Sequence, residues 1–202
     1  MPTPKIIPNG EPVIFAEGRI GAIVQFPVLV SDGKISQPKR FEKFVRPPGT
    51  RVIAVKDEKI YLQKERRLEK GSEADWRLPG GKVVDTFEEY KPYLSQPIPE
   101  AIILVAAAKE LREEAGLEAA SLSLFSKQAC GATVEWDLYY VLAEEVHEVA
   151  SDHLEAGEDI EESGWFTYSE VLEKCRFGEI SEGRTVAALL QFVSKHGIES
   201  KA

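Results

Sequence analysis

Residues 108–117 read Ala108-Lys109-Glu110-Leu111-Arg112-Glu113-Glu114-Ala115-Gly116-Leu117, and the interpretation of the whole chain begins from this stretch. On an α-helix, positions three and four apart share a face, so three carboxylates gather on one side of it. Leu104 and Leu111 belong to a separate apolar stripe that would dock the helix onto a core. Carboxylate oxygens suit Mg²⁺ or Mn²⁺, although a solvated face is the commoner meaning of an acidic helix.

A glycine pair lies upstream of this helix, in Trp76-Arg77-Leu78-Pro79-Gly80-Gly81-Lys82. It ends an apolar run, and a backbone without Cβ atoms can approach a ligand closely. The loop and the acidic helix together favour a ligand-binding site over a solvated face.

The two segments together resemble the Nudix box, whose pattern is Gly-x5-Glu-x7-Arg-Glu-U-x-Glu-Glu-x-Gly-U, with U aliphatic. The second half matches at every specified position except Lys109, which replaces Arg and keeps the charge without the planar fork. Between Gly81 and Lys109 the chain also carries 14 residues more than the pattern allows. This insertion displaces the first Glu of the box, and Glu88, Glu89 and Glu100 are the candidates to replace it.

Composition narrows the classes of function. A formal net charge of -9 argues against a nucleic-acid-binding surface, which needs a basic stripe. The two cysteines, Cys130 and Cys175, are too few for a disulfide framework and are expected to be reduced thiols of the core. The longest strictly apolar run, Ala101–Ala108, is too short to span a bilayer, and no signal peptide opens the chain. We therefore expect a cytoplasmic protein that does not enter a membrane.

The N-terminal segment reads as a small antiparallel β-sheet. Apolar alternation runs through residues 11–46, with a turn at residues 31–34, and stops at Arg46-Pro47-Pro48-Gly49. Such a sheet buries little by itself, which favours dimerisation through it. The predicted organisation is an N-terminal β extension over residues 1–46, acting as a dimerisation element, followed by a catalytic domain over residues 47–202.

The remaining elements favour an α/β fold. A hairpin around residues 56–58 runs into the basic cluster Lys64-Glu65-Arg66-Arg67, which either contacts phosphate or ribose or is a solvated strand end. A short helix and a turn are expected in residues 83–99, followed by the acidic helix, which Pro99 opens and Gly116 closes. Strands are expected at residues 121–127, 134–143 and 163–166. The last two elements are a helix capped at Thr167 or Ser169 that runs to Lys174, and a helix over about residues 182–195. Residues 70–75 are expected to form a polar loop. This order suits an α/β/α sandwich with a mixed central sheet.

The C-terminal half is similar to one branch of the family, the ADP-ribose and nucleoside-diphosphate-sugar pyrophosphatases. The similarity rests on Gly157-Glu158-Asp159-Ile160-Glu161, on Trp165, on Phe177–Ile180 and on Thr185–Leu190. Members of this branch commonly form homodimers by exchanging N-terminal strands. A proline that many ADP-ribose hydrolases carry beyond the box is replaced here by Thr133, which leaves the second half of the substrate open.

The resemblance also implies roles for individual residues. Glu158 matches the position of the general base best, with Glu155 and Glu161 as rivals. Lys109 is expected to pair with a box carboxylate, and Glu113 to act in catalysis as well as in metal binding. The implied Mg²⁺ ligands, with Mn²⁺ as a possible substitute, are the main-chain carbonyl of Gly80 and the carboxylates of Glu110, Glu113 and Glu114. The candidate substrate contacts are Arg46, Arg67 and Gly81.

The predicted function is therefore metal-dependent hydrolysis of the pyrophosphate bond in a nucleoside diphosphate linked to another moiety, such as ADP-ribose or a nucleotide sugar. Two alternatives stay open. One is a house-cleaning nucleoside triphosphate pyrophosphohydrolase, which would favour a monomer without the N-terminal sheet. The other is a catalytically silent nucleotide-sugar sensor of the same fold, which the Lys109 substitution and the displaced first Glu keep in consideration.

Overall fold

The computed structural model describes residues 3–67, 73–149 and 159–197. It divides into two compact units. The first comprises residues 1–48, 84–99 and 129–137, and the second comprises residues 49–83, 100–128 and 138–202. The boundary expected after residue 46 thus falls after Pro48, and the first unit also takes two later segments. No helix in the described part of the chain combines the length and apolarity needed to cross a membrane.

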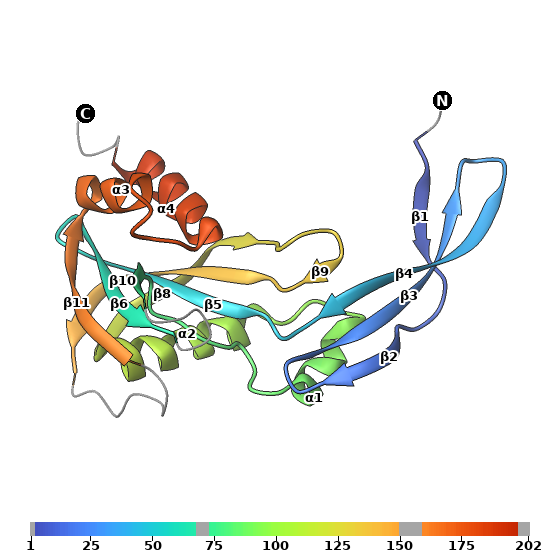
Figure 1. Cartoon of the computed structure of the whole chain (residues 1–202), viewed down its shortest axis with the longest axis horizontal. Helices are drawn as coiled ribbons and strands as arrows, with labels where there is room; N and C mark the ends of the chain where they lie inside the picture. The colour runs from blue at the N-terminus through green and yellow to red at the C-terminus, as the bar shows by residue number, and fades with distance from the viewer. Residues whose placement is uncertain (1–2, 68–72, 150–158, 198–202) are drawn as a thin grey trace. The chain divides into compact units, whose positions relative to one another are not determined.

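The first unit is built on a five-stranded sheet in the order β1-β3-β4-β9, with β2 also paired to β3 (Figure 1). All of its pairings are antiparallel except that of β4 with β9. The expected N-terminal antiparallel sheet is therefore present and is extended by a short parallel strand. Its strands are β1 (Lys5–Pro8), β2 (Val13–Gly18), β3 (Gly21–Ser31), β4 (Ser36–Val45) and β9 (Val134–Glu135).

The insertion within the box folds onto this sheet. It forms a short α1 (Phe87–Tyr90) and then a 3-10 turn, η2 (Lys91–Leu94), as the sequence predicted. The side chains of Phe87 and Tyr90 are buried in one apolar cluster with Ala22, Val24 and Val45 of the strands. The extra residues of the box therefore supply a cover for the N-terminal sheet.

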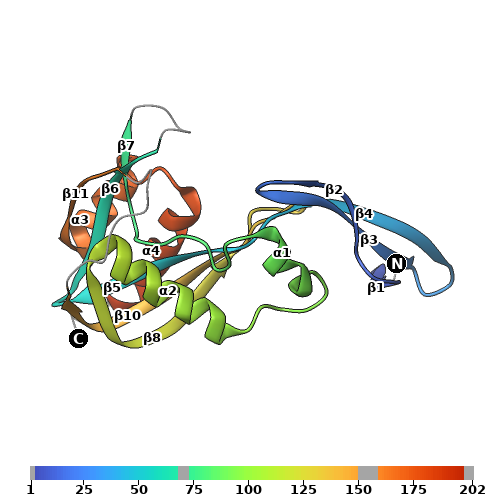
Figure 2. The same ribbon diagram turned by 90° about the horizontal axis from the view of Figure 1, so that it is seen from below.

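The second unit contains a six-stranded mixed sheet in the order β11-β6-β5-β10-β8, with β7 paired to β6. Only β5 and β10 run parallel. Helix α2 lies on one face of the sheet, and α3 and α4 lie on the other (Figures 1 and 2). The expected α/β/α sandwich is confirmed. Its elements are β5 (Gly49–Lys56), β6 (Lys59–Arg66), β7 (Ala74–Arg77), α2 (Glu100–Ala115), β8 (Leu117–Gln128), β10 (Leu138–Glu148), β11 (Asp159–Thr167), α3 (Tyr168–Arg176) and α4 (Gly183–His196).

Strand β5 lies inside this sheet and is covered on both faces. Val52, Ile53 and Ala54 are fully buried, as expected for a strand between two helical layers. Its hairpin to β6 turns at Asp57 and Glu58, and both residues have positive φ, 50° and 57°. Two positive φ values in a two-residue loop match the twist of paired strands.

The helix ends follow the sequence signals closely. Helix α2 begins at Glu100, so Pro99 lies one residue before the position expected for it. It ends at Ala115, and Gly116, the residue after it, has φ 61° and donates its N–H to the carbonyl of Arg112 at 3.1 Å. Thr167 caps α3 in a reciprocal capping box with Glu170.

Some expectations were wrong. Residues 74–77 form β7, where the sequence suggested a polar loop as far as residue 75, and β1 was not foreseen. Both strands have four residues, too few to show a clear alternation. Both cysteines are free thiols, but Cys130 is exposed, so the expectation of a core position fails for it. Cys175 is partly buried, and burial raises its pKa.

Candidate active site

The Gly80-Gly81 loop lies along β5. The carbonyl of Pro79 accepts a hydrogen bond from the N–H of Val52 at 2.8 Å, and that of Gly81 accepts from the N–H of Thr50 at 2.9 Å. Gly80 has φ 147°, and a Cβ there would lie 2.2 Å from the Thr50 carbonyl oxygen. Only glycine allows this approach. The strand therefore fixes the loop through the backbone.

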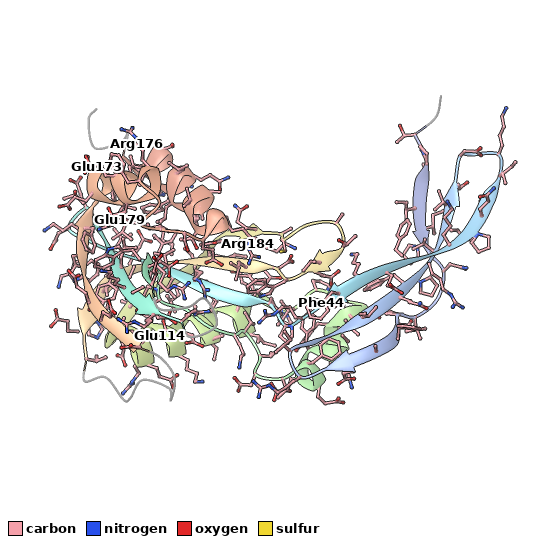
Figure 3. All side chains as sticks on the ribbon, viewed as in Figure 1. Phe44, Glu114, Glu173, Arg176, Glu179 and Arg184 are labelled. Carbon is pink, nitrogen blue, oxygen red and sulfur yellow. The ribbon has the colours of Figure 1, made fainter. Side chains whose placement is uncertain are left out.

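Two carboxylates of α2 meet this loop. Oε2 of Glu114 accepts from the N–H of Gly80 at 2.7 Å and from Nε2 of the buried Gln63 at 2.8 Å. A Cβ on Gly81 would lie 2.3 Å from Oε1 of Glu110, so this carboxylate lies directly against the glycine. Figure 3 shows Glu114 on the α2 side of the sheet. The loop and the acidic helix, far apart in sequence, form one site.

The third box carboxylate points elsewhere. Oε2 of Glu113 lies 3.5 Å from Nζ of Lys109, one turn earlier on α2. In this arrangement, the described ranges contain no group of three or more His, Cys, Asp or Glu side chains placed closely enough to hold a metal ion. Mg²⁺, however, is commonly held by one or two carboxylates, with water and substrate phosphates completing its shell. Two hard carboxylates beside a backbone carbonyl of the glycine pair fit that donor set.

A basic group lies near these carboxylates. Nε of Arg67 donates to Oε1 of the buried Glu65 at 2.7 Å. Burial alone would lower the pKa of Arg67, but the hydrogen bond and charge of Glu65, with the charges of Glu114 and Glu182, raise it. Arg67 is thus a firmly held cation within the field of a box carboxylate.

Glu65 is the centre of this ion-pair cluster. Its Oε2 also accepts from Nη1 of Arg77 on β7 at 2.7 Å, and both side chains of that pair are buried. Burial pushes the pKa of Glu65 upward more than any other single influence, but Arg67 and Arg77 together outweigh it and hold the pKa below its ordinary value. The sequence pointed to the basic cluster but not to the role of Glu65 in ordering it.

A second buried ion pair approaches the loop from the opposite side. Arg51 on β5 donates from Nη1 to the carbonyls of Thr50 at 2.9 Å and of Gly80 at 2.8 Å. Its Nε lies 3.3 Å from Oε2 of Glu182, the N-cap residue of α4. The sequence analysis missed both residues, because they are separated by 131 positions and neither belongs to the box.

The first turn of α4 is tied to the sheet beside this pair. Thr185 donates from Oγ1 to Oε2 of Glu182 at 2.9 Å, and its Oγ1 lies 3.1 Å from the hydroxyl of Tyr140. Burial raises the pKa of Tyr140 to about 12, so the phenol is neutral. Burial favours a higher pKa for Glu182, but the Arg51 charge, aided by Thr185 and nearby arginines, lowers it.

Arg46 and Glu161 have contacts of their own. Arg46 belongs to the first unit, where its guanidinium lies 4.2 Å from the centroid of the Trp136 ring. Glu161 on β11 pairs with Arg66 on β6. Glu155 and Glu158 lie outside the described residues, so their roles stay predictions.

The three candidates for the displaced first Glu also have positions of their own. Glu88 pairs with Lys91, and Glu89 accepts from the N–H of Asp85 at 3.0 Å. Glu100 starts α2, about 15 Å along the helix axis from Glu110 at 1.5 Å per residue. Neither the local bonding of Glu88 and Glu89 nor the position of Glu100 identifies a replacement.

Comparisons with known proteins place these features in context. A family model described as "NUDIX domain" matches residues 45–188. A search of curated proteins gave no match. A solved structure titled "Crystal structure of ADP compounds hydrolase" aligns with a TM-score of 0.65 and 17% identity, covering 98% of this chain and 96% of that one. The solution structure of the E. coli ORF135 protein aligns with a TM-score of 0.51 and 18% identity, covering 74% and 92%. At these identities, the two structures share a fold with this chain.

Proposed function

This chain belongs to the Nudix family of pyrophosphohydrolases, and from that premise we propose that it cleaves the pyrophosphate bond of a nucleoside diphosphate linked to another moiety, such as ADP-ribose or a nucleotide sugar. The observation that carries the proposal is the meeting of Glu110 and Glu114 with the Gly80-Gly81 loop, beside the cation of Arg67.

The proposal includes a divalent metal, Mg²⁺ or Mn²⁺. Glu110, Glu114 and the carbonyl of Gly80 would hold it, with Glu113 joining them from its pair with Lys109. Such an ion neutralises phosphate oxygens and lowers the pKa of a bound water. Gln63 supports this set, because its side-chain amide donates to Oε2 of Glu114 and so helps to fix the carboxylate.

The substrate contacts are proposed from charge. Pyrophosphate is a poor electrophile because its own anionic oxygens repel a nucleophile, so cations must face them. Arg67, Arg46 and Gly81 are the proposed contacts, and the bond that fixes the Arg67 guanidinium to Glu65 supports the first of them. Glu158 is the proposed base for the attacking water, because it matches the position of the base in the branch that the C-terminal half resembles, and a base must come within hydrogen-bond reach of that water.

The choice of substrate class draws on the extent of the structural likeness. The solved ADP compounds hydrolase aligns over nearly the whole chain, so the alignment extends beyond the catalytic unit to the N-terminal sheet. This supports a nucleoside diphosphate derivative over a nucleoside triphosphate. A homodimer through the N-terminal sheet and a cytoplasmic location complete the proposal.

A turnover screen tests it. Purified protein is incubated with ADP-ribose, nucleotide sugars, dinucleoside polyphosphates and dNTPs, each with Mg²⁺ or Mn²⁺, and products are separated by chromatography. We expect metal-dependent release of a nucleoside monophosphate from one of the first three classes. Preference for dNTPs would replace the proposal with the house-cleaning activity. Tight binding of a nucleotide sugar without turnover would replace it with a sensor.

A further inference from the structure

The carbonyl of Gly80 is held by a buried cation. The guanidinium of Arg51 bridges this carbonyl and that of Thr50 through one nitrogen, with a side chain only 5% exposed. The N–H of Gly80 meanwhile donates to Glu114. A single glycine is therefore held between a box carboxylate on one side and an arginine on the other.

Glu182 sets the direction of Arg51. Its carboxylate contacts Nε of the guanidinium, so the planar fork is fixed with Nη1 toward the loop. Thr185 in turn fixes the carboxylate of Glu182 from the first turn of α4. The resulting chain of contacts runs from the N-terminus of α4 through Arg51 to the backbone of the catalytic loop.

The charges of Arg51 and Glu182 affect how strongly a metal can bind at the Gly80 carbonyl. A lone guanidinium at the Gly80 carbonyl would repel a divalent cation bound to that carbonyl, and burial weakens the screening of this repulsion by water. Glu182 carries the opposite charge in contact with the same guanidinium. The pair is neutral as a whole, so it can hold the loop without opposing the metal.

We propose that Glu182 and Arg51 are positioning residues for the metal: Arg51 fixes the Gly80 carbonyl, and Glu182 both orients Arg51 and cancels its charge. The proposal rests on the proposed function, because it concerns the metal that pyrophosphate cleavage requires. It assigns no chemical step to either residue.

The first test is a calorimetric titration of the substrate-free protein with Mn²⁺. Glu182→Gln keeps the shape of the side chain and removes its charge. We expect its Kd for Mn²⁺ to rise about 10-fold to 100-fold, the usual range when an outer-shell partner of a metal site is lost. Glu179→Gln is the matched control, because Glu179, labelled in Figure 3, is nearby in sequence. It pairs with Lys174, which is not part of this network. The control should bind Mn²⁺ like the parent.

Two further variants separate charge from structure. In Glu182→Gln/Arg51→Met, the guanidinium at the Gly80 carbonyl is gone, so the Kd should return part of the way to the parental value. Thr185→Val removes the tie between α4 and both Glu182 and Tyr140 but leaves the ion pair in place. It should lower the melting temperature and change the Kd much less than Glu182→Gln does. A metal-free thermal melt of every variant verifies that it is folded.

Each outcome decides the matter. If Glu182→Gln binds Mn²⁺ as tightly as the parent, the positioning role is refuted while the proposed function stands. If the double variant binds more weakly than Glu182→Gln, charge cancellation by Glu182 is refuted, because the lost contact of Arg51 with the Gly80 carbonyl then outweighs its lost charge. If Thr185→Val weakens Mn²⁺ binding as much as Glu182→Gln, the pair serves only to anchor α4. If the parent binds no Mn²⁺, the proposed function fails first and this inference falls with it.

Discussion

Glu113 differs from its two neighbours in the box, because it pairs with Lys109 while Glu110 and Glu114 meet the glycine loop. Glu113→Gln keeps the shape and removes one charge. If Glu113 joins the metal, turnover should fall at least ~100-fold, since a lost metal-bound charge is worth a few kcal/mol. The free energy of unfolding should change by no more than about 0.5 kcal/mol, the scale of a partly exposed i,i+4 pair. Steady-state kinetics and urea denaturation measure both, and near-normal turnover would remove Glu113 from the site.

Lys109 is the point at which the box departs from its pattern. Its ammonium lies 3.5 Å from Glu113, a separation at which a guanidinium fork could form paired hydrogen bonds instead. Lys109→Arg should therefore keep or raise kcat. Lys109→Ala should lose about 10-fold to 100-fold, as expected when a group that orients a metal ligand is removed. If Lys109→Ala turns over like the parent, Lys109 is a solvated residue and the departure from the pattern has no consequence.

Strands β6 and β7 are joined by an ion pair that makes their stability depend on pH. The pKa of Glu65 is lower than its ordinary 4.5 in the folded protein, so its contribution is present above that pH and is lost as the pH falls through the folded value. Glu65→Gln removes the closer of two carboxylates at the buried Arg77, since Asp75 lies 3.7 Å away, and should cost about 3 kcal/mol at pH 7. This difference from the parent should shrink as the pH falls below 4.5.

Urea denaturation at a series of pH values measures that trend. Glu173→Gln, which changes an exposed acid on α3, is the control and should follow the parent at every pH. A constant difference between Glu65→Gln and the parent down to low pH would mean that folding does not lower the pKa of Glu65.

The segment between β10 and β11 carries the proposed base. Glu158→Gln should lower kcat steeply and leave the affinity for metal and substrate almost unchanged, because only proton transfer is removed. Glu161 is held by Arg66 on the neighbouring strand, so Glu161→Gln should keep most of its rate. Glu155→Gln is the second comparison. If either loses more turnover than Glu158→Gln, the base is misassigned, and full rates in all three would move the proton to a box glutamate or to bulk water.

The elements that the sequence predicted are those with a local signal. Helix α2 has a 3.6-residue apolar period and a closing Gly116, and α3 has a capping box, so both could be read within a single segment. The four-residue β7 has no such period, and it becomes a strand only by pairing with β6. Residues 74–77 are a strand because of this tertiary pairing, which leaves no local signal in the sequence.

The site also has one part with a local sequence signal, the box glutamates, and one part without it, Arg51 and Glu182. Glu110 and Glu114 lie within a few residues of each other, and their pattern indicated an acidic face. The bond from Arg51 to the Gly80 carbonyl joins residues 29 positions apart, and the one to Glu182 spans 131. Neither residue type nor spacing marks such contacts, because they depend on β5 lying between the loop and α4.

At the scale of the whole molecule, apolar exposure is uneven. Ten large hydrophobic side chains are exposed in the described part of the chain, and seven of them lie in the N-terminal strands and their turns: Ile6, Ile7, Val13, Phe15, Ile20, Ile35 and Phe41. Scattered exposed hydrophobics are normal, but their concentration on one small sheet favours a contact with another molecule there. Covering these side chains with a second copy of the chain is the dimer that we propose.

Substitution tests this dimer more cleanly than truncation. Removing residues 1–45 would also strip the sheet from Phe87 and Tyr90 of the box insertion, so a loss of activity in that protein would have two causes. Phe15→Ser and Ile35→Ser instead change side chains that are 66% and 61% exposed and leave that buried cluster intact.

The double variant Phe15→Ser/Ile35→Ser should therefore remain folded, with a melting temperature at or below the parent's, and should shift from dimer to monomer in light scattering at micromolar concentration. Serine at these two positions removes the apolar side-chain area whose burial would hold two copies together. Leu190→Ser on α4, 45% exposed in the second unit, is the matched control and should leave the dimer intact. A parent protein that is already monomeric at this concentration, or a double variant that stays dimeric, would rule out this surface as the interface.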